Sequence, residues 1–254
     1  MDNSEKETSN PFMQPKHKNW KEYFLEFVMI FLAVTLGFVA DNIRESLGDR
    51  EKEKQYIEGF IRNLKDDTEN LSHVIESNRR TLMGIDSLLM ISHSNMAVDS
   101  NRRSFYYYVI KYCYNSSSFK SNDDTLEQLK STGDYRLIEK DHVADSLTKY
   151  YSDMRNIYKQ GEYYETYFNE IISRLDELAN VTVIGDTSFI KMGKMAERQF
   201  PQLRTDNGKL ITFFNKVFVF KTITNAYVEN NLALQLKNSK RLSEFLRNQY
   251  NVQE

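Results

Sequence analysis

The dominant hydrophobic pattern of the chain is an apolar run near the N terminus, within residues 23–42. Residues 27–40 are apolar apart from Thr35 and Gly37, and no charge interrupts them. A helix needs roughly 20 apolar residues to cross about 30 Å of hydrocarbon, with a lower limit near 17. The run reaches that length only when it is extended through Glu26. We therefore predict a membrane-spanning helix with one carboxyl group near its end, where the group can reach the interface or a partner.

The flanks of this run favour a span over residues 20–43. Trp20 and Tyr23 lie where interfacial aromatic residues are expected. The alternatives are a cleaved signal peptide and a buried helix of a soluble protein. A signal peptide needs small residues at its cleavage site, and residues 38–40 (FVA) match that pattern poorly. Residues 1–19 are polar and aperiodic, so we predict a disordered tail ahead of the anchor.

The orientation of the anchor is only weakly indicated by charge. Lysine and arginine residues precede and follow the span in similar numbers, so the positive-inside rule hardly discriminates. We expect the arrangement that is commoner for an N-terminal anchor, with the tail inside and the body, residues 44–254, outside.

Beyond the span, an apolar stripe predicts a long helix to about Met90. The stripe packs in the core of its own domain or, alternatively, in a coiled coil with a partner. Thr68 and Asn78 are polar interruptions, and Gly48 is a candidate bend. The apolar positions, at spacings of three, four or seven, are Ile57, Ile61, Leu64, Leu71, Ile75, Leu82, Ile85 and Leu89.

The rest of the chain is predicted as helices joined by loops. Asp123 and Asp124 are expected to cap one short helix, Gly133 to end it, and Asp141 to cap the long helix that follows. Helices are predicted at 105–110, 125–131, 141–179, 188–198 and 206–250. The composition of 105–110 also suits a strand, and 211–224 is a β-branched and aromatic stretch within the last helix. Loops are predicted at 92–103, 115–122 and 181–186, the last with room for one small strand.

Composition supports a helical body. Only three Pro and nine Gly occur in 254 residues, so helix breakers are rare. The net charge of -2 provides no electrostatic footprint for nucleic acid. Tyr and Phe are abundant, at 16 each, which suits a bundle packed by aromatic side chains. Cys113 is the single cysteine, so no internal disulfide can form, and we expect a buried structural thiol.

Two stretches carry a resemblance to a known family. Residues 125–151 (TLEQLKSTGDYRLIEKDHVADSLTKYY), with Glu26, Gly37, Asn42 and Glu45 of the anchor, resemble a family of uncharacterised bacterial single-pass membrane proteins, a domain of unknown function. In that family an N-terminal Gly-Glu-aliphatic span ends in an Asn-rich segment, and a Leu-Lys-Ser-Ser-Gly-aliphatic stretch lies mid-chain.

The match is closest mid-chain. Residues 129–133 (LKSTG) follow the family's stretch, whereas residues 24–25 replace its usual small residue and Ile43 stands where it often has Trp. Because the family carries no established activity, the resemblance implies topology and a bacterial membrane location but no chemistry.

No catalytic or metal-binding signature emerges. The four histidines are scattered, and Glu69, His73 and Glu76 on one helix lack a second set of ligands, so we interpret them as a solvated face. The carboxylates of Asp66 and Asp67 are interpreted in the same way. The chain holds no phosphate loop, nucleophile elbow or zinc-protease helix. We therefore expect no enzyme, cofactor or metal site, and we interpret the tyrosine clusters as core rather than pocket.

The combined prediction is an all-α protein: a single transmembrane helix that continues into a long helix and a helical bundle. Its expected function is that of a non-enzymatic scaffold or partner-binding subunit of the bacterial inner membrane, with the bulk in the periplasm. Glu26, Ala33 and Gly37 are the candidate helix-association residues, because small residues let helices approach closely. The expected partners are the lipid bilayer and a second copy or another membrane protein. The alternative is a sensor-like domain that binds a small ligand.

Overall fold

The computed structural model describes residues 19–114, 116–180, 200–204 and 207–252. The regular structure in these ranges is helical throughout, which confirms the all-α prediction. The chain divides into two compact units, Met1–Lys52 and Glu53–Glu254. Helix α1 (Trp20–Met90) contributes to both, and it is unbroken at Gly48.

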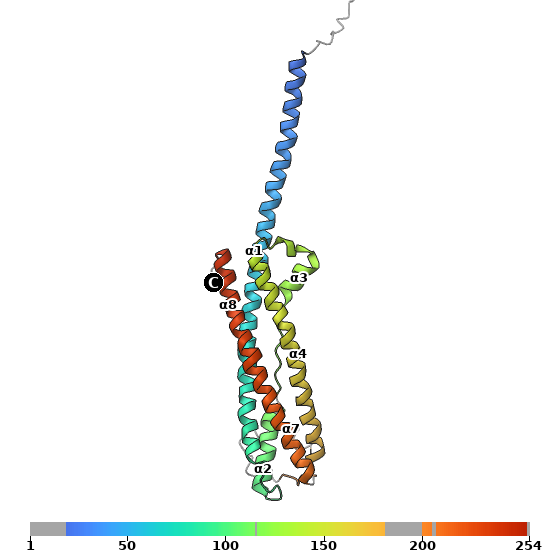
Figure 1. Ribbon diagram of the computed structural model, residues 1–254, viewed down its shortest axis with the longest axis vertical. Helices are drawn as coiled ribbons and strands as arrows, with labels where there is room; N and C mark the ends of the chain where they lie inside the picture. The colour runs from blue at the N-terminus through green and yellow to red at the C-terminus, as the bar shows by residue number, and fades with distance from the viewer. Residues whose placement is uncertain (1–18, 115, 181–199, 205–206, 253–254) are drawn as a thin grey trace, which may run out of the picture. The chain divides into compact units, whose positions relative to one another are not determined.

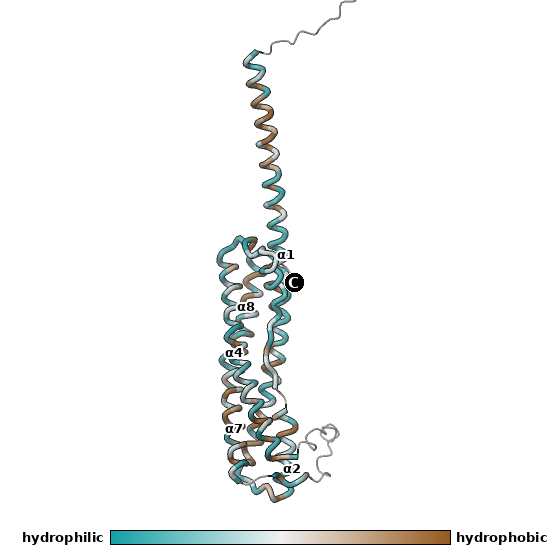
Figure 2. Tube along the Cα trace, turned by 90° about the vertical axis from the view of Figure 1, so that its right-hand side faces the viewer, coloured by the Kyte–Doolittle hydropathy of each residue, from teal (hydrophilic) through white to brown (hydrophobic). Residues whose placement is uncertain are grey.

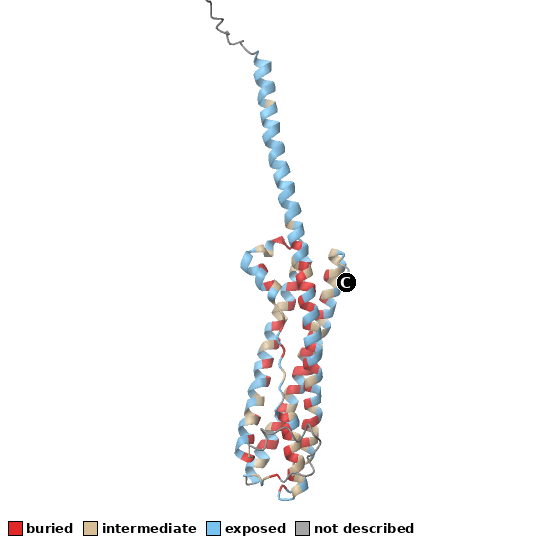
Figure 3. Ribbon diagram, turned by 180° about the vertical axis from the view of Figure 1, so that it is seen from behind, coloured by how far each residue is buried: buried red, intermediate tan, exposed pale blue. Residues whose placement is uncertain are grey.

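The described part of the first unit is helix without a core of its own. Its apolar side chains are exposed apart from the half-buried Val28, as the mostly pale blue helix in Figure 3 and its brown band in Figure 2 show. The hydroxyl of Thr35 donates to the carbonyl of Phe31 at 2.8 Å, so the polar group within the apolar run is satisfied inside the helix. This stretch is long and apolar enough to cross a membrane, although a signal sequence would have the same character.

The second unit is an up-and-down bundle of four arms. Figure 1 shows α1 and α4 running in one direction and α7 and α8 running back. The remaining arm begins as α2 and η1, continues as an extended segment and ends in α3. The bounds are α2 Asp99–Tyr108, η1 Val109–Cys113, α3 Asp124–Thr132, η2 Asp134–Leu137, α4 Asp141–Leu178, α7 Asn207–Ala226, η4 Tyr227–Leu232 and α8 Ala233–Tyr250.

The core of the bundle is aromatic at its centre. Of the eight stripe positions on α1, all but Leu82 and Leu89 are buried, and those two are half-buried. Opposite the stripe, Tyr164 stacks on Tyr227 with ring centroids 5.4 Å apart. The largest fully buried side chains include Phe60, Phe105, Tyr106, Tyr164, Phe213 and Phe220. The interpretation of the tyrosine clusters as core is therefore confirmed for Tyr106 and Tyr164, whereas Tyr163 is exposed.

Two glycines fit their places for steric reasons. Gly133 ends α3 in the left-handed region, at φ 73°, where its amide bonds the carbonyl groups of Leu129 and Lys130. This confirms the predicted helix stop. Gly84 is buried in α1, and a Cβ there would overlap the ring of Tyr112.

Several predicted boundaries are wrong in detail. Residues 99–103 belong to helix α2 rather than to a loop, because the exposed side chain of Asp99 bonds Arg102 at 2.7 Å and supports the first turn. Asp123 makes no side-chain cap; the Oδ1 of Asn122 accepts the amide of Asp124 instead. Asp141 is the first residue of α4 and not its cap.

The last arm is helical from Asn207 to Tyr250, with one π-helical turn at η4, so its β-branched stretch is helix. The predicted loop at 181–186, the helix at 188–198 and the tail at 1–18 lie outside the described residues.

Candidate functional site

The predicted association residues lie on an exposed helix. Glu26, Ala33 and Gly37 are exposed, and a methyl group added at Gly37 would meet nothing within 4 Å. Residues seven apart in a helix lie on nearly the same side, so Glu26 and Ala33 share a face and Gly37 lies one turn further on. None of the apolar window of α1 is buried by the rest of the chain.

The most unusual element of the bundle is its extended segment, residues 116–122, which we call the strap. The strap lies among α1, α4 and η4. A helix in this place would satisfy its backbone groups internally, whereas an extended segment needs hydrogen-bond partners from its neighbours. Phenol groups from neighbouring helices satisfy it instead. The amides of Ser117, Phe119 and Ser121 donate to the hydroxyl oxygens of Tyr164, Tyr227 and Tyr158, at 3.3, 3.2 and 3.2 Å respectively. These alternate positions are one face of an extended chain.

The strap is bound to α1 as well. Asn78 is buried and donates from its amide nitrogen to the carbonyls of Ser117, at 2.8 Å, and Val74, at 2.9 Å. Its amide oxygen accepts the hydroxyl of Tyr164 at 2.9 Å. The polar interruption at Asn78 in the apolar stripe is therefore a fully bonded bridge between α1, the strap and α4.

At the far end of the strap lies a buried carboxylate. Asp67 is 1% exposed, and its oxygens accept the backbone amide of Asn122 and the hydroxyl of Tyr150, each at 2.7 Å. The pKa of Asp67 is raised to about 6, mainly because burial disfavours the charged carboxylate. The nearby carboxylates of Asp66 and Asp123 also raise the pKa, whereas the two hydrogen bonds lower it. The interpretation of Asp67 as a solvated residue is therefore wrong.

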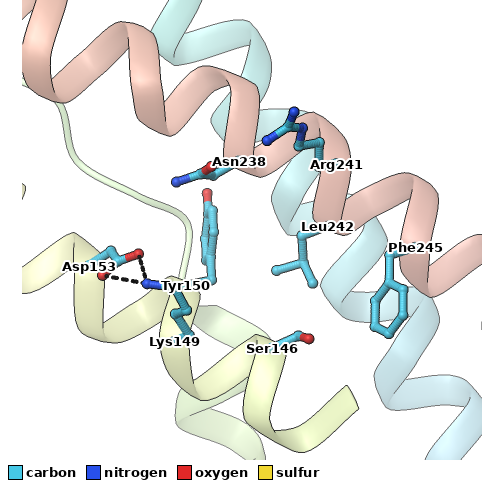
Figure 4. Close-up of a pocket in the computed structure, with 8 residues that line it drawn as sticks. All are labelled: Ser146, Lys149, Tyr150, Asp153, Asn238, Arg241, Leu242 and Phe245. Atoms are coloured by element: carbon cyan, nitrogen blue, oxygen red, sulfur yellow. Dashed lines mark hydrogen bonds and ion pairs between the residues drawn. The ribbon is translucent and has the colours of Figure 1, made fainter. Parts of the chain in front are cut away.

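Tyr150 connects this carboxylate to a surface pocket between α4 and α8 (Figure 4). The pocket has a volume of about 260 Å³. Each helix contributes residues at i, i+3, i+4 and i+7, the face that one helix turns to its neighbour. The lining residues are Ser146, Lys149, Tyr150 and Asp153 from α4, and Asn238, Arg241, Leu242 and Phe245 from α8.

The pocket opens because polar or short side chains replace core residues at this seam. Leu242 and Tyr150 are buried at 7% and 4% exposure and form an apolar floor. The pocket extends along α8 into a hollow of about 310 Å³ that shares Lys149, Asp153 and Asn238 with it. There the buried side-chain nitrogen of Gln235 has no hydrogen-bond partner among the described residues.

Two other hollows flank the bundle. One, of about 340 Å³, lies between α3, the strap and α4, and its wall includes Tyr151, whose buried hydroxyl is unpaired among the described residues. The other, of about 580 Å³, lies between the end of α1 and α7, with exposed Met90, Ile211 and Phe218 on its wall. Neither gathers several unpaired donors over an apolar floor.

The remaining candidate groups are structural. Cys113 is 2% exposed, and burial raises the pKa of its thiol to about 12, which makes it inert. Glu69, His73 and Glu76 are exposed, as predicted for a solvated face. Within the described ranges, no group of three His, Cys, Asp or Glu side chains could hold a metal ion.

Comparisons of the chain with protein-family models, with curated proteins and with solved structures find no match. The resemblance to bacterial single-pass membrane proteins therefore stays a prediction, and the geometry has to carry the functional argument.

Sequence reasoning missed Asp67, Gln235 and Arg241. For Asp67 a signal was present, because it lies three residues after Leu64 and four before Leu71, within the buried stripe. A carboxylate at such a position indicates a buried polar contact.

Proposed function

We propose that the chain is a non-enzymatic, membrane-anchored bundle protein that associates with a second copy of itself through the exposed face of α1. The observation that carries the proposal is the apolar window of α1, none of which is buried by its own chain. A core helix of a soluble protein is mostly buried, so this exposure favours lipid or a partner as the surroundings.

The exposed face has the spacing of a helix-pairing seam. Glu26, Ala33, Ala40 and Leu47 follow one another at intervals of seven, and all are exposed. Met29, Leu36 and Ile43 form a second row at the same interval, three residues further on, exposed at 61, 64 and 56%. Two such rows are the a and d positions of a heptad repeat.

A second copy is the partner that this seam fits. Two copies inserted in one membrane with the same orientation place the same heptad rows at the same depth, so the rows of one copy can pack against those of the other. Ala33, Gly37 and Ala40 allow close approach within the apolar run, whereas Ile43 and Leu47 continue the seam past it.

Cysteine crosslinking in membranes tests this proposal. The only native cysteine is buried and inert, so Ile43→Cys can be introduced alone. We expect disulfide-linked dimers for Ile43→Cys under mild oxidation and few for the control Glu45→Cys, because Glu45 lies on the opposite side of the helix.

Adding Ala33→Leu and Gly37→Leu to the Ile43→Cys variant should lower its crosslinking, because two leucines hold the helices apart. Equal crosslinking at positions 43 and 45, or no effect of the two leucines, would contradict pairing through this face. N-terminal sequencing of the mature protein separates an uncleaved anchor from a removed signal.

A second function, ligand sensing by the bundle, is favoured by the pocket between α4 and α8. Its apolar floor and its convergent polar side chains are typical of small-molecule sites.

A further inference from the structure

The charges around the pocket of Figure 4 do not cancel. Lys149 and Asp153 are one turn apart on α4 and form an ion pair at 3.1 Å, which neutralises both. Arg241 lines the pocket from α8 and makes no ion pair or hydrogen bond with the described residues. The pocket therefore presents one uncompensated positive charge.

Donor and apolar groups are separated along α8. Figure 4 shows Asn238 and Arg241 on successive turns near one end of the pocket, with Leu242 and Phe245 continuing toward the other. Asn238, like Arg241, has no hydrogen bond with another described residue. Across the pocket, the hydroxyl of Tyr150 already donates to Asp67, so Tyr150 would contact a ligand through the face of its ring.

We propose that this pocket binds a small monoanionic carboxylate that carries a compact aromatic or branched apolar body. The guanidinium of Arg241 pairs with the carboxylate in the planar geometry that arginine favours, and the amide of Asn238 supplies a further donor. The apolar body lies against Tyr150, Leu242 and Phe245. The volume of about 260 Å³ limits the ligand to a small molecule.

Other ligand charges fit less well. A cation would meet Asp153 already neutralised by Lys149 and would face Arg241. A neutral isostere would keep the apolar contacts but leave the guanidinium without a counter-ion. The inference rests on the second function, ligand sensing, and is independent of pairing through the anchor.

Calorimetric titration of the full-length protein in a non-ionic detergent, at low ionic strength, tests the proposal. The probes are phenylacetate, 2-phenylethanol and 2-phenylethylamine, which share a ring and differ in charge. We expect phenylacetate to bind about two- to fivefold more tightly than the alcohol, because only the carboxylate can pair with Arg241, which is exposed to solvent. Equal binding of the three probes, or no binding of phenylacetate, overturns the proposal.

Matched variants locate the site. Arg241→Gln should remove the preference for phenylacetate over the alcohol, and Phe245→Ala should weaken both probes together. Arg155→Gln is the control, because Arg155 lines the hollow on the other side of α4. A loss with Arg155→Gln as large as that with Arg241→Gln overturns the assignment. The paired leucine substitutions at positions 33 and 37 should leave binding unchanged, so the two proposals fail separately.

Discussion

The buried carboxylate of Asp67 predicts an unusual dependence of stability on pH. Its pKa is raised from 3.8 to about 6, so between these values the folded protein holds a proton that the unfolded chain releases. The contribution of Asp67 to stability is therefore complete below pH 4 and is lost as the pH rises through 6. This is the reverse of the usual carboxylate, which is stabilised in its charged form by a partner.

The size of the effect follows from the same values. Each pH unit between the two pKa values is worth about 1.4 kcal/mol, so a folded-state pKa of about 6 corresponds to about 3 kcal/mol. Asp67 is 1% exposed, so solvent screening does not reduce this figure much. The nearest carboxylates, Asp66 and Asp123, act in the same direction as burial, and the hydrogen bonds from Asn122 and Tyr150 oppose it.

The test is the variant Asp67→Asn, which has nearly the same shape and cannot titrate. Its amide oxygen can accept the amide of Asn122, and the hydroxyl of Tyr150 can rotate to accept from the new nitrogen. We expect wild type and variant to have similar free energies of unfolding at pH 4. At pH 7 the variant should be the more stable by about 3 kcal/mol.

Urea unfolding of the full-length protein in detergent measures both free energies, followed by the near-ultraviolet circular dichroism of the tyrosines. Asp145→Asn is the control, because Asp145 is an exposed carboxylate on α4. Its difference from wild type should be the same at pH 4 and pH 7. If Asp67→Asn differs from wild type by the same amount at both pH values, the pKa of Asp67 is not shifted by folding. If the variant loses stability only at pH 7, the carboxylate is charged and favourable in the folded protein. Either result would refute the reasoning.

Two further substitutions test the packing of the bundle in the same unfolding assay. Gly84→Ala should destabilise by about 1–3 kcal/mol because the added methyl overlaps the half-buried ring of Tyr112. Gly48→Ala, where nothing lies within 4 Å, should be neutral or up to about 1 kcal/mol stabilising, and equal effects of the two substitutions would contradict the close contact at Gly84. Tyr164→Phe should cost about 1–3 kcal/mol, because the buried amide oxygen of Asn78 and the half-buried backbone amide of Ser117 lose this hydrogen-bond partner. Tyr163→Phe, at an exposed position, should change stability by less than about 0.5 kcal/mol. Matching values for the two phenylalanine variants would show that the strap does not depend on the phenol.

The helices of this chain were predictable because their information is periodic and local. The stripe on α1 and the stop at Gly133 each depend on neighbours within a few turns, and the structure keeps both. Helix ends were less predictable, because Asp123 and Asn122 compete to cap α3 and composition does not distinguish them.

The strap and the pocket could not be predicted from local pattern. Residues 116–122 are polar apart from Phe119 and resemble an ordinary surface loop, and only contacts with residues about 40 to 110 positions away in sequence hold them against the bundle. The pocket between α4 and α8 likewise depends on which faces of two distant helices meet. From the sequence alone, Arg241 cannot be distinguished from the other charged residues of the helix surface.

The strap gives three of the tyrosines a role beyond core packing. An extended backbone inside a bundle has amides that no helical ladder satisfies, and each buried amide without a partner costs about 1–3 kcal/mol. Phenylalanine would fill the same space but accept no hydrogen bond. Tyr158, Tyr164 and Tyr227 bring an acceptor to every second amide of the strap while their rings remain in the core. Tyr150 extends the same arrangement to Asp67, so tyrosine supplies both the packing and the polar partners of the arm that contains the strap.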